Sequence, residues 1–383
     1  MTVAAPVQGR RAHTAGPSSP GRPRRSGGQR QTRAGWLFVT PMLVILGLFL
    51  VLPILMALWV SVSDWTGRGS PFSSNVGFVG TENYRQLLTE DGLSRQDFMT
   101  SMRNTFYYVV GVVPLQTGLA LWLAVIVNQK FLKGRTFFRT AFYFPSVVSS
   151  VAISLVFLFL FTGTGAVNQG LSAIGIDGPV WFSDSRGLVH LALDWLGVWN
   201  SDAPPSSLAG TDVLGLSMWE WLAGPSVAMS AIMVQVIWTT AGTFMLMFLA
   251  ALQDLPAEVE EAALVDGASR WGVFRNVTVP HLRPTILLVV TLGIIGTWQV
   301  FDQVYVMTNG GPAKTTLTPA FLSYQAAFLN QQWGQGAAIA FILFALIFFL
   351  TSLQRFVLRD KDEAARKKAL RIQRRRARAG VTA

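Results

Sequence analysis

Two helix faces inside apolar runs carry small and hydroxyl-bearing side chains that can bind a polyol. In the run 226–250, positions spaced i, i+3, i+4 and i+7 share one face of a helix. They are Val236, Thr239, Thr240 and Thr243. The run 284–307 repeats the spacing with Gly293, Gly296, Thr297 and Val300. Threonine hydroxyls both donate and accept hydrogen bonds, so the two faces can line a cavity for a hydroxylated solute. Small residues and threonine also hold membrane helices together, so a packing role stays open.

Asp302 is the one acid inside these apolar runs. An intramembrane carboxylate is costly, and it usually faces a polar interior or a partner. It can contact a solute, or it can bond to a helix end. We expect the second role, and loss of uptake in a well-expressed Asp302→Asn variant would reverse that expectation.

Other residues with chemical potential do not form a recognisable centre. The three histidines (His13, His190 and His281) are far apart and lack metal-ligand spacing. There is no cysteine, so thiol chemistry and a disulfide framework are excluded. The phosphate-binding pattern G-x-x-x-x-G-K-[ST] does not occur. We therefore expect no catalytic residue, metal or cofactor on this chain; if ATP and Mg²⁺ drive it, another chain binds them.

Composition places these residues in a membrane protein. Hydrophobic residues make up 51% of the 383 residues and charged residues only 13%, against roughly 25% charged in soluble domains. The net charge of +11 resides in the tails and short loops and not in a basic globular domain, so nucleic acid is not an expected partner.

Six runs are long and apolar enough to span a bilayer, which takes about 20 residues. They cover about 36–62, 104–127, 137–161, 226–250, 284–307 and 336–357. These runs predict an all-α membrane domain over 36–357, with a kink at Phe144-Pro145 in the third run.

Lysine and arginine predict the orientation of the spans. Of the 31 basic residues, seven fall in 1–34, four in 128–139, three in 251–283 and eleven in 355–383, which leaves six in the other loops. Cytoplasmic loops carry the excess of positive charge, so both termini and the loop 251–283 are expected inside.

The polar stretch that begins at Pro256 has the local signals of a helix, a turn and a second helix. Proline suits the first turn of a helix, and the acids that follow favour the helix dipole. Gly267 interrupts the run and permits a turn. A second short helix, about 269–278, is expected to end before Pro280. Physically this is a docking element outside the hydrocarbon.

The residues of this loop closely resemble the EAA signature of permease subunits of ABC importers. The matching positions are Glu261, Ala262, Ala263, Asp266, Gly267 and Pro280. The family usually has Ile and Leu where this chain has Val277 and Val279, a departure that keeps the apolar character. The segments 77–84, 128–145 and 301–312 are similar to those of the carbohydrate-uptake members of the family. Together the resemblance covers about 36–357.

The resemblance implies a type I importer permease in the plasma membrane of a prokaryote, for a sugar or oligosaccharide. It implies a second permease subunit, ATP-binding subunits and an extracytoplasmic solute-binding protein as partners, with alternating access as the mechanism. The loop at Glu261 and Gly267 would be the helix that couples ATP hydrolysis to the spans. In maltose-type permeases, positions matching the two small-residue faces contact the sugar and carry larger polar and aromatic side chains, so a wider pocket or another ligand is expected here.

Three segments lie outside the resemblance. The outer loop 162–225 has one arginine against six acids, and the stretch about 184–222 within it looks like an insertion. We expect this outer insertion (residues 184–222) to form a small cap, with an interfacial helix near 188–199, that touches the membrane surface or the binding protein. A packing embellishment is the alternative. The tail 1–34 is expected to be disordered, and the tail 358–383 to rest on anionic lipid or stay solvated.

Two other functions compete with sugar import. One is an ABC importer permease for another solute, such as a polyamine or a glycerol-phosphate ester; a phosphate ester would require pore-facing basic residues, and no span interior offers one. The other is an ion-coupled carrier or channel. That class predicts repeats, broken helices and several intramembrane ionisable groups.

Overall fold

The computed structural model describes residues 27–129, 131–199 and 205–357. The tail beyond 357, and most of the tail before 35, lie outside these residues. Helix α1 (Gly27–Leu46) already begins at Gly27, so the expectation that residues 27–34 belong to a disordered tail is wrong. Glutamine, arginine and alanine in this segment are compatible with a helix, and they extend the apolar helix that follows.

Two compact units divide the chain at Met56. The first holds α1, a π-helical turn (Gly47–Val51) and the start of α2 (Leu52–Ser61). The apolar helical stretch Gly35–Ser61 is long enough to cross a membrane.

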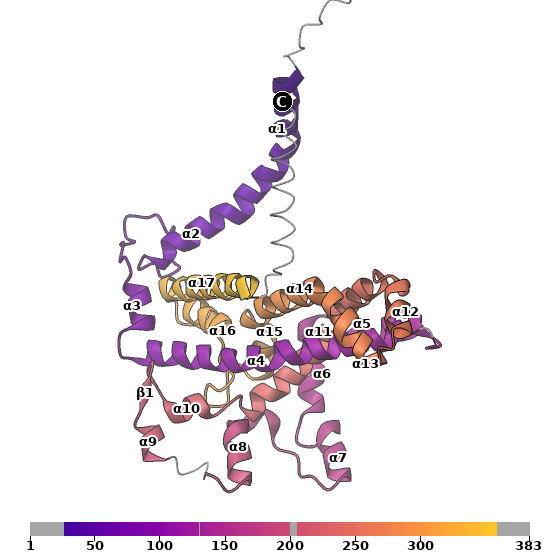
Figure 1. The fold of residues 1–383 in the computed structure, drawn as a ribbon. Coiled ribbons are helices and arrows are strands. Elements are labelled where there is room, and N and C mark those ends of the chain that lie inside the picture. The colour runs from indigo at the N-terminus through magenta and orange to yellow at the C-terminus, as the bar shows by residue number, and fades with distance from the viewer. Residues whose placement is uncertain (1–26, 130, 200–204, 358–383) are drawn as a thin grey trace, which may run out of the picture. The chain divides into compact units, whose positions relative to one another are not determined.

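Four long helices form the frame of the second unit. They are α4 (Leu93–Asn128), α11 (Val227–Gln253), α14 (Val279–Trp298) and α17 (Trp333–Val357). In Figure 1, α4 runs along the bundle and α17 and α14 follow one another above it. With its 36 residues, α4 is roughly 54 Å long at 1.5 Å per residue, so it extends beyond a hydrocarbon core of about 30 Å. Within the described residues, five helical stretches can cross a membrane, or up to six if a bent pair counts as one span.

The bent pair replaces the kinked third span expected over 137–161. Helices α5 (Arg135–Val147) and α6 (Ser150–Leu160) meet at 98°. Pro145 lies in the last turn of α5, where it removes one helical hydrogen bond. The chain bends three residues later, where Val148 and Ser149 are extended, and serine is a favoured residue immediately before a new helix.

The fifth span, expected over 284–307, has different limits at both ends. Helix α13 (Arg270–Val273) does not end before Pro280; it continues through a π-helical turn (Phe274–Thr278) into α14. Pro280 therefore falls in the first turn of α14, and the wider π turn before it accommodates the missing N–H. At the other end α14 stops at Trp298, and a short α15 (Asp302–Met307) follows after a break.

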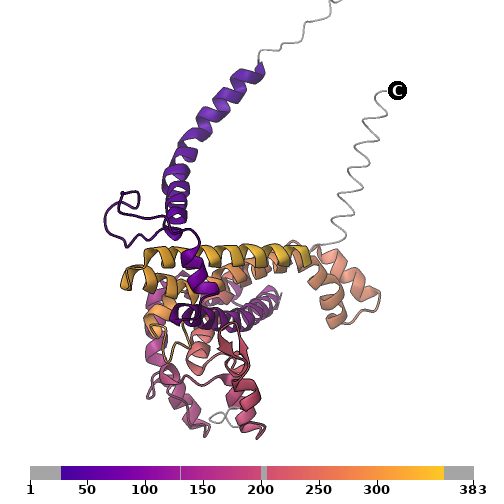
Figure 2. The ribbon, with the colours of Figure 1, turned by 90° about the vertical axis from the view of Figure 1, so that its left-hand side faces the viewer.

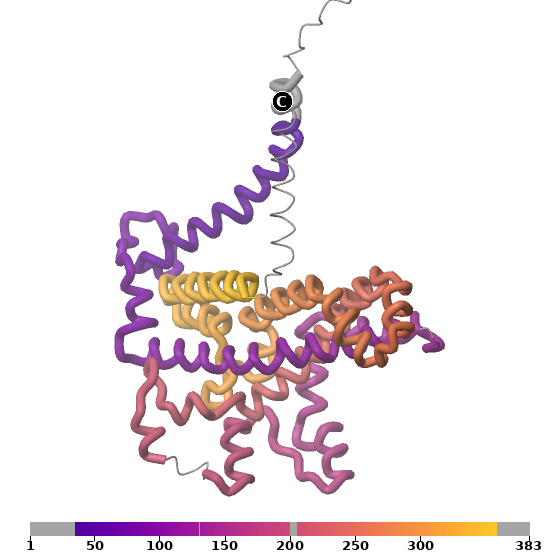
Figure 3. Tube along the Cα trace, viewed as in Figure 1, coloured from indigo at the N-terminus to yellow at the C-terminus, as the bar shows by residue number. Residues whose placement is uncertain are grey.

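Shorter elements surround the long helices. They are α3 (Glu82–Leu88), α7 (Ala166–Ala173), a 3₁₀ turn (Trp181–Ser183), α8 (Leu188–Trp195), α9 (Ser206–Ala209), α10 (Met218–Leu222), α12 (Ala257–Val265), α16 (Pro319–Tyr324) and a π-helical turn (Gln325–Leu329). Strands β1 (Asp212–Val213) and β2 (Leu216–Ser217) pair antiparallel, with Val213 opposite Leu216. Figures 2 and 3 place α7 to α10 together on one side of α4. In Figure 1, α12 and α13 lie at the end of the bundle where α4 finishes, and α3 and β1 lie at the opposite end.

Two clusters of apolar side chains pack between α4 and α11, at different levels along these helices. One includes Tyr108 and Val112 of α4, Met229 to Val236 of α11, and parts of α6 and α15. The other lies farther along the same helices, with Ala120 to Val127 of α4 and Phe244 to Leu252 of α11, and adds α14. The residues between the two clusters are therefore the place where polar groups meet inside the bundle.

Candidate solute pathway and coupling surface

Two adjoining cavities lie at that intermediate level. The first, of about 240 Å³, opens between α4, α11 and α14, and we call it the α14 cavity. The second, of about 290 Å³, opens between α5, α6 and α11, and we call it the α6 cavity. Thr240, Phe244 and Gln303 line both, so the two are neighbours.

All eight residues expected on the two small-residue faces line these cavities. The α14 cavity takes Val236, Thr240, Gly293, Gly296, Thr297 and Val300. The α6 cavity takes Thr239, Thr240 and Thr243. A β-carbon at Gly296 would meet no atom within 4 Å, so this glycine leaves the α14 cavity open. The structure thus brings the two faces together, while their contact with a solute stays a prediction.

Gln116 is the central polar side chain of the α14 cavity. It is 1% exposed and comes from α4, between the two apolar clusters. Its Oε1 lies 2.7 Å from the Thr240 hydroxyl, whose single proton is shared between this oxygen and the Val236 carbonyl. Its Nε2 finds no partner among the described residues. Gly293 makes room for that amide, because a β-carbon there would lie 2.6 Å from Nε2.

A buried amide donor without a partner costs roughly 1–3 kcal/mol, so it points to a group that completes the site. The hydroxyl of Tyr108, which also lines the α14 cavity, is fully buried and similarly lacks a partner in the described part of the chain. On the α6 cavity, the Oε1 of Gln235 is a buried acceptor that no described residue satisfies. Two donors and one acceptor on residues that line these cavities therefore have no partner among the described residues, and all three atoms are covered by protein.

A chain of polar side chains connects Asp302 to Gln235. Ser150, the first residue of α6, donates its hydroxyl to Asp302 Oδ2. The Ser154 hydroxyl donates to the Ser150 carbonyl at 2.7 Å and accepts from Gln235 Nε2 at 2.9 Å. Asp302 thus bonds to a helix start, and it also lines the α14 cavity. Both expected roles of this carboxylate are compatible with its position.

Both broken helices contribute their breaks to the cavities. The α6 cavity includes Val148 at the bend between α5 and α6, and the α14 cavity includes Gln299 to Phe301 between α14 and α15. Irregular backbone at membrane depth is tolerated where it is buried in protein or lines a polar cavity. The two breaks therefore support a polar passage at this level.

Sequence reasoning missed the residues that carry the unsatisfied groups, Tyr108, Gln116 and Gln235, and it missed Gln303, which lines both cavities. A signal was available, because Gln116 and Gln235 are isolated amides within long apolar runs. A buried amide also requires a hydrogen-bond partner, although leaving it unpaired costs less than leaving a carboxylate such as Asp302 unpaired.

The polar loop 251–283 forms the helix and the turn at Gly267 that the sequence predicts. After α12, Gly267 adopts φ +86°. The Gly267 N–H donates to the Leu264 carbonyl at 3.1 Å and the Ala268 N–H donates to the Ala263 carbonyl at 3.0 Å, which is the Schellman pattern for ending a helix. Ser269 then caps α13 by accepting from the Gly272 N–H at 3.1 Å. Glycine is needed here because other residues are strained at this φ.

The outer face of α12 is exposed and partly apolar. Glu261, Ala262 and Asp266 are exposed and Ala263 is half-buried. Val265 is 87% exposed, and Leu264 and Trp271 are also exposed large apolar side chains. An apolar face on a helix outside the bundle is typical of a protein interaction site. Pro280 does not join this surface, since it lies at the base of α14.

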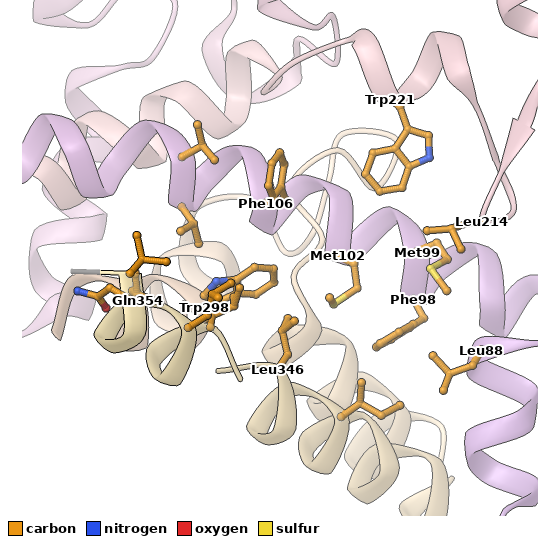
Figure 4. Close-up of a pocket in the computed structure, with 17 residues that line it drawn as sticks. Leu88, Phe98, Met99, Met102, Phe106, Leu214, Trp221, Trp298, Leu346 and Gln354 are labelled. Atoms are coloured by element: carbon orange, nitrogen blue, oxygen red, sulfur yellow. The ribbon is translucent and has the colours of Figure 1, made fainter. Parts of the chain in front are cut away.

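A third cavity, on another face of α4, is unsuited to a sugar. It is a groove of about 740 Å³ along α4, α14 and α17, between Leu88 at one end and Gln354 at the other (Figure 4). Apart from Gln354 and two tryptophans, its described lining is entirely hydrocarbon or thioether. Hydroxyl groups would lose their hydrogen bonds to water there without replacement.

Comparison with known proteins points to one transport family. Residues 116–362 match the family model described as binding-protein-dependent transport system inner membrane component. The lactose transport system permease protein LacF of Rhizobium radiobacter is 32% identical over 330 residues, which cover 85% of this chain and 94% of that protein. The multiple sugar-binding transport system permease protein MsmF of Streptococcus mutans is 31% identical, over 84% of this chain and 93% of that protein.

More distant matches agree. The trehalose/maltose transport system permease protein MalF of Thermococcus litoralis is 29% identical over 84% of this chain and 92% of its own. Among solved structures, a bacterial ABC transporter involved in the import of the acidic polysaccharide alginate has a chain that superposes with a TM-score of 0.64 at 18% identity, covering 86% of this chain and 98% of that one. At this identity the superposition establishes the fold, which is that of an ABC importer permease.

Proposed function

Because the chain belongs to the binding-protein-dependent transport system inner membrane component family, we propose that it is a permease subunit of an ABC importer for a sugar or oligosaccharide. It is a multi-pass membrane protein of mainly helical fold. The observation that carries the sugar assignment is the α14 cavity, where donors from α4 face hydroxyl-bearing residues of α11 and α14. The named relatives are sugar permeases, which supports the same assignment.

A sugar hydroxyl can satisfy both unpaired donors of the α14 cavity. The free Nε2 of Gln116 and the Tyr108 hydroxyl would donate to hydroxyl oxygens of the solute, and Gln235 Oε1 would accept from one on the α6 side. A phosphate ester would instead want a lysine or arginine, and the described lining of the two cavities contains none. The permease performs no covalent chemistry in this scheme.

The exposed face of α12 is the surface that would dock on an ATP-binding subunit. Leu264 and Val265 supply the apolar contact, and Glu261 and Asp266 supply charge at its rim. ATP and Mg²⁺ would bind on that partner, and closure of the ATP-binding dimer would move α12. The ion-coupled carrier is set aside by family membership, whereas a non-sugar solute remains the alternative that the experiment decides.

The remaining partners follow from the same proposal. We place the protein in the plasma membrane of a prokaryote with both termini and α12 inside, as the basic residues favour. A second permease subunit would complete the pathway, and an extracytoplasmic binding protein would deliver the solute. The outer insertion would contact the membrane surface or that binding protein. Deleting 186–220 without any change in uptake or binding-protein affinity would contradict this role.

Co-purification tests the proposal. A tagged chain is purified from its native membrane in mild detergent, and mass spectrometry identifies what accompanies it, for wild type, Val265→Asp and Glu261→Lys/Gly267→Asp. We expect an ATPase and a second permease with wild type, and loss of the ATPase alone with the variants. Glu90→Lys, a charge reversal on the loop after α3, is the control and should keep the ATPase.

Uptake of labelled sugars in the same cells tests the solute class. Saturable uptake of a sugar or oligosaccharide that stops when the ATPase is depleted supports the proposal. A chain that purifies alone, with uptake indifferent to ATPase depletion, would overturn it. Uptake of a polyamine but of no sugar would retain the importer and reject the sugar assignment.

A further inference from the structure

The outer insertion encloses a polar cavity that is separate from the two central ones. Its volume is about 540 Å³, and we call it the cap cavity. Helix α4 supplies one wall, α8 and α10 supply a second, and residues 313–315 close a third. Most of its described lining is polar or charged. A packing embellishment would be expected to fill such a space with apolar side chains.

Arg103 is the least compensated cation on these walls. It is 8% exposed, and in the described part of the chain it forms no ion pair with a carboxylate. Its Nη atoms donate to the Glu220 carbonyl at 3.3 Å and to Asn104 Oδ1 at 3.1 Å. Its Nε, however, is buried and has no acceptor among the described residues. A buried guanidinium N–H of this kind requires an acceptor, and a carboxylate is the strongest one.

The other charged groups of the cap cavity already have partners. Lys314 pairs with Asp97 at 2.6 Å, and Arg186 pairs with Asp184 at 2.7 Å. The Glu220 carboxylate partly balances Arg103, but it also accepts from the backbone N–H and the hydroxyl of Ser217. Among the charged groups of the cap cavity that have been described, Arg103 is therefore the one that lacks a hydrogen-bond acceptor.

His190 presents a second unsatisfied atom to the same cavity. Its ring stacks on Trp219 with centroids 3.9 Å apart, it is 8% exposed, and its Nε2 is buried without a partner in the described chain. Burial lowers the pKa of His190, so the ring is neutral at pH 7. A neutral imidazole carries one N–H and one acceptor nitrogen, and a hydroxyl can pair with either of them.

We infer that the cap cavity binds a hydroxylated carboxylate, of which a sugar acid is the simplest kind. The carboxylate takes the Nε–H of Arg103, and a hydroxyl of the same molecule pairs with His190 Nε2. One donor for an anion and one ring nitrogen for a hydroxyl fit such a molecule better than a bare anion or a neutral sugar. This site is independent of which solute passes through the central cavities.

Calorimetric titration tests the inference on the full chain with its partner subunits in lipid nanodiscs. The probes are D-glucuronate, D-glucose, which lacks the carboxylate, and acetate, which lacks the hydroxyls. We expect glucuronate to bind about tenfold or more tighter than either, as a charge-assisted hydrogen bond implies. Arg103→Gln should weaken glucuronate about tenfold to hundredfold. The matched control is Arg85→Gln, which removes an exposed arginine of α3 outside the cap cavity and should change nothing.

Arg103 also holds α10, so its loss can loosen the outer insertion. Thr100→Phe fills the cap cavity without replacing any partner in the bonds of Arg103 to Glu220 and Asn104, and it should abolish glucuronate binding in a well-folded protein. The inference is overturned if wild type does not bind glucuronate, if glucose binds as well as glucuronate, or if both variants bind like wild type. Binding that is lost in Gln116→Leu but kept in Arg103→Gln would place glucuronate in the central cavities, and would also overturn it.

Discussion

Replacing Gln116 with leucine separates a solute-binding role from a packing role, because the two predict opposite effects. The amide is 1% exposed, with one atom bonded to Thr240 and the other unpaired among the described residues. If the amide serves packing alone, its removal relieves a buried unpaired donor and nothing else changes. If it serves a sugar, its removal takes away a donor that only the solute uses.

The magnitudes follow from those bonds. Removing the unpaired Nε2 gains roughly 1–3 kcal/mol, and losing the bond from Thr240 costs about 1 kcal/mol. Thr240 still donates to the Val236 carbonyl at 2.7 Å, so its hydroxyl is not stranded. We therefore expect Gln116→Leu to unfold at the same temperature as wild type or above. A sugar hydroxyl left without its donor loses about 1.5–3 kcal/mol, so uptake at low sugar concentration falls about tenfold to hundredfold.

The assay pairs initial uptake rates in cells with thermal unfolding of the purified complex. Thr117→Val is the matched control: the next residue also carries a buried hydroxyl without a described partner, yet it lines neither central cavity. It should keep wild-type uptake. Gln116→Leu with normal uptake and normal stability would refute the assignment of the α14 cavity to the solute. A large loss of stability would refute the free energies assigned above to the hydrogen bonds of Gln116.

Three further predictions follow from the structure. The β-carbon of Gly267→Ala would meet no atom, but alanine is strained at φ +86°, so the substitution should destabilise the end of α12 by about 1 kcal/mol. We expect normal assembly and reduced transport, measured as uptake per purified complex. Wild-type uptake would contradict this prediction. Asp302→Asn keeps an oxygen that can accept from Ser150, so expression and uptake should both survive; lost uptake at normal expression would make this carboxylate a solute or coupling residue. The bond from Arg186 holds the pKa of Asp184 below its ordinary value, so its stabilising contribution is present above about pH 4 and is lost as pH falls through the lowered pKa; the protection of residues 184–199 from hydrogen exchange, relative to an unstructured peptide at the same pH, should fall there, and Asp184→Asn should show low protection at every pH.

Periodicity in the sequence predicted which residues meet at the centre of the bundle. The hydroxyl and glycine faces of α11 and α14 are visible as spacing, because a helix returns to the same face every three or four residues. Their partners on α4 are Tyr108 and the amide of Gln116, which stand among apolar residues and form no hydroxyl or glycine repeat. The importance of Gln116 depends on Gly293 lying opposite, and that is a fact of three-dimensional packing.

The two helix breaks were beyond the reach of hydropathy. A hydropathy window averages residues 148–149 and 299–301 with their apolar neighbours, so it does not detect either break. Proline lay near one break only: the bend at 148–149 follows Pro145 by three residues, whereas no proline lies near 299–301. Pro145 lies inside α5, and Pro280 lies inside the continuous helix from Arg270 to Trp298. A π turn or a first-turn position satisfies the backbone at a proline, so proline marks a break only when neither is available.

Helix α12, the proposed docking element, is connected on both sides to helices that line the central cavities. Helix α11 leads into it directly, and after Gly267 the chain returns through α13 and the π turn into α14 without a loop. Glu260 on α12 also approaches Thr278 at the base of α14, with their side-chain oxygens 3.5 Å apart. These two helices carry the hydroxyl and glycine faces of the cavities, so displacement of α12 must alter α11 or α14 first. The breaks at 148–149 and 299–301 lie beyond that level, where a change in α14 can reshape the cavity without unwinding a span.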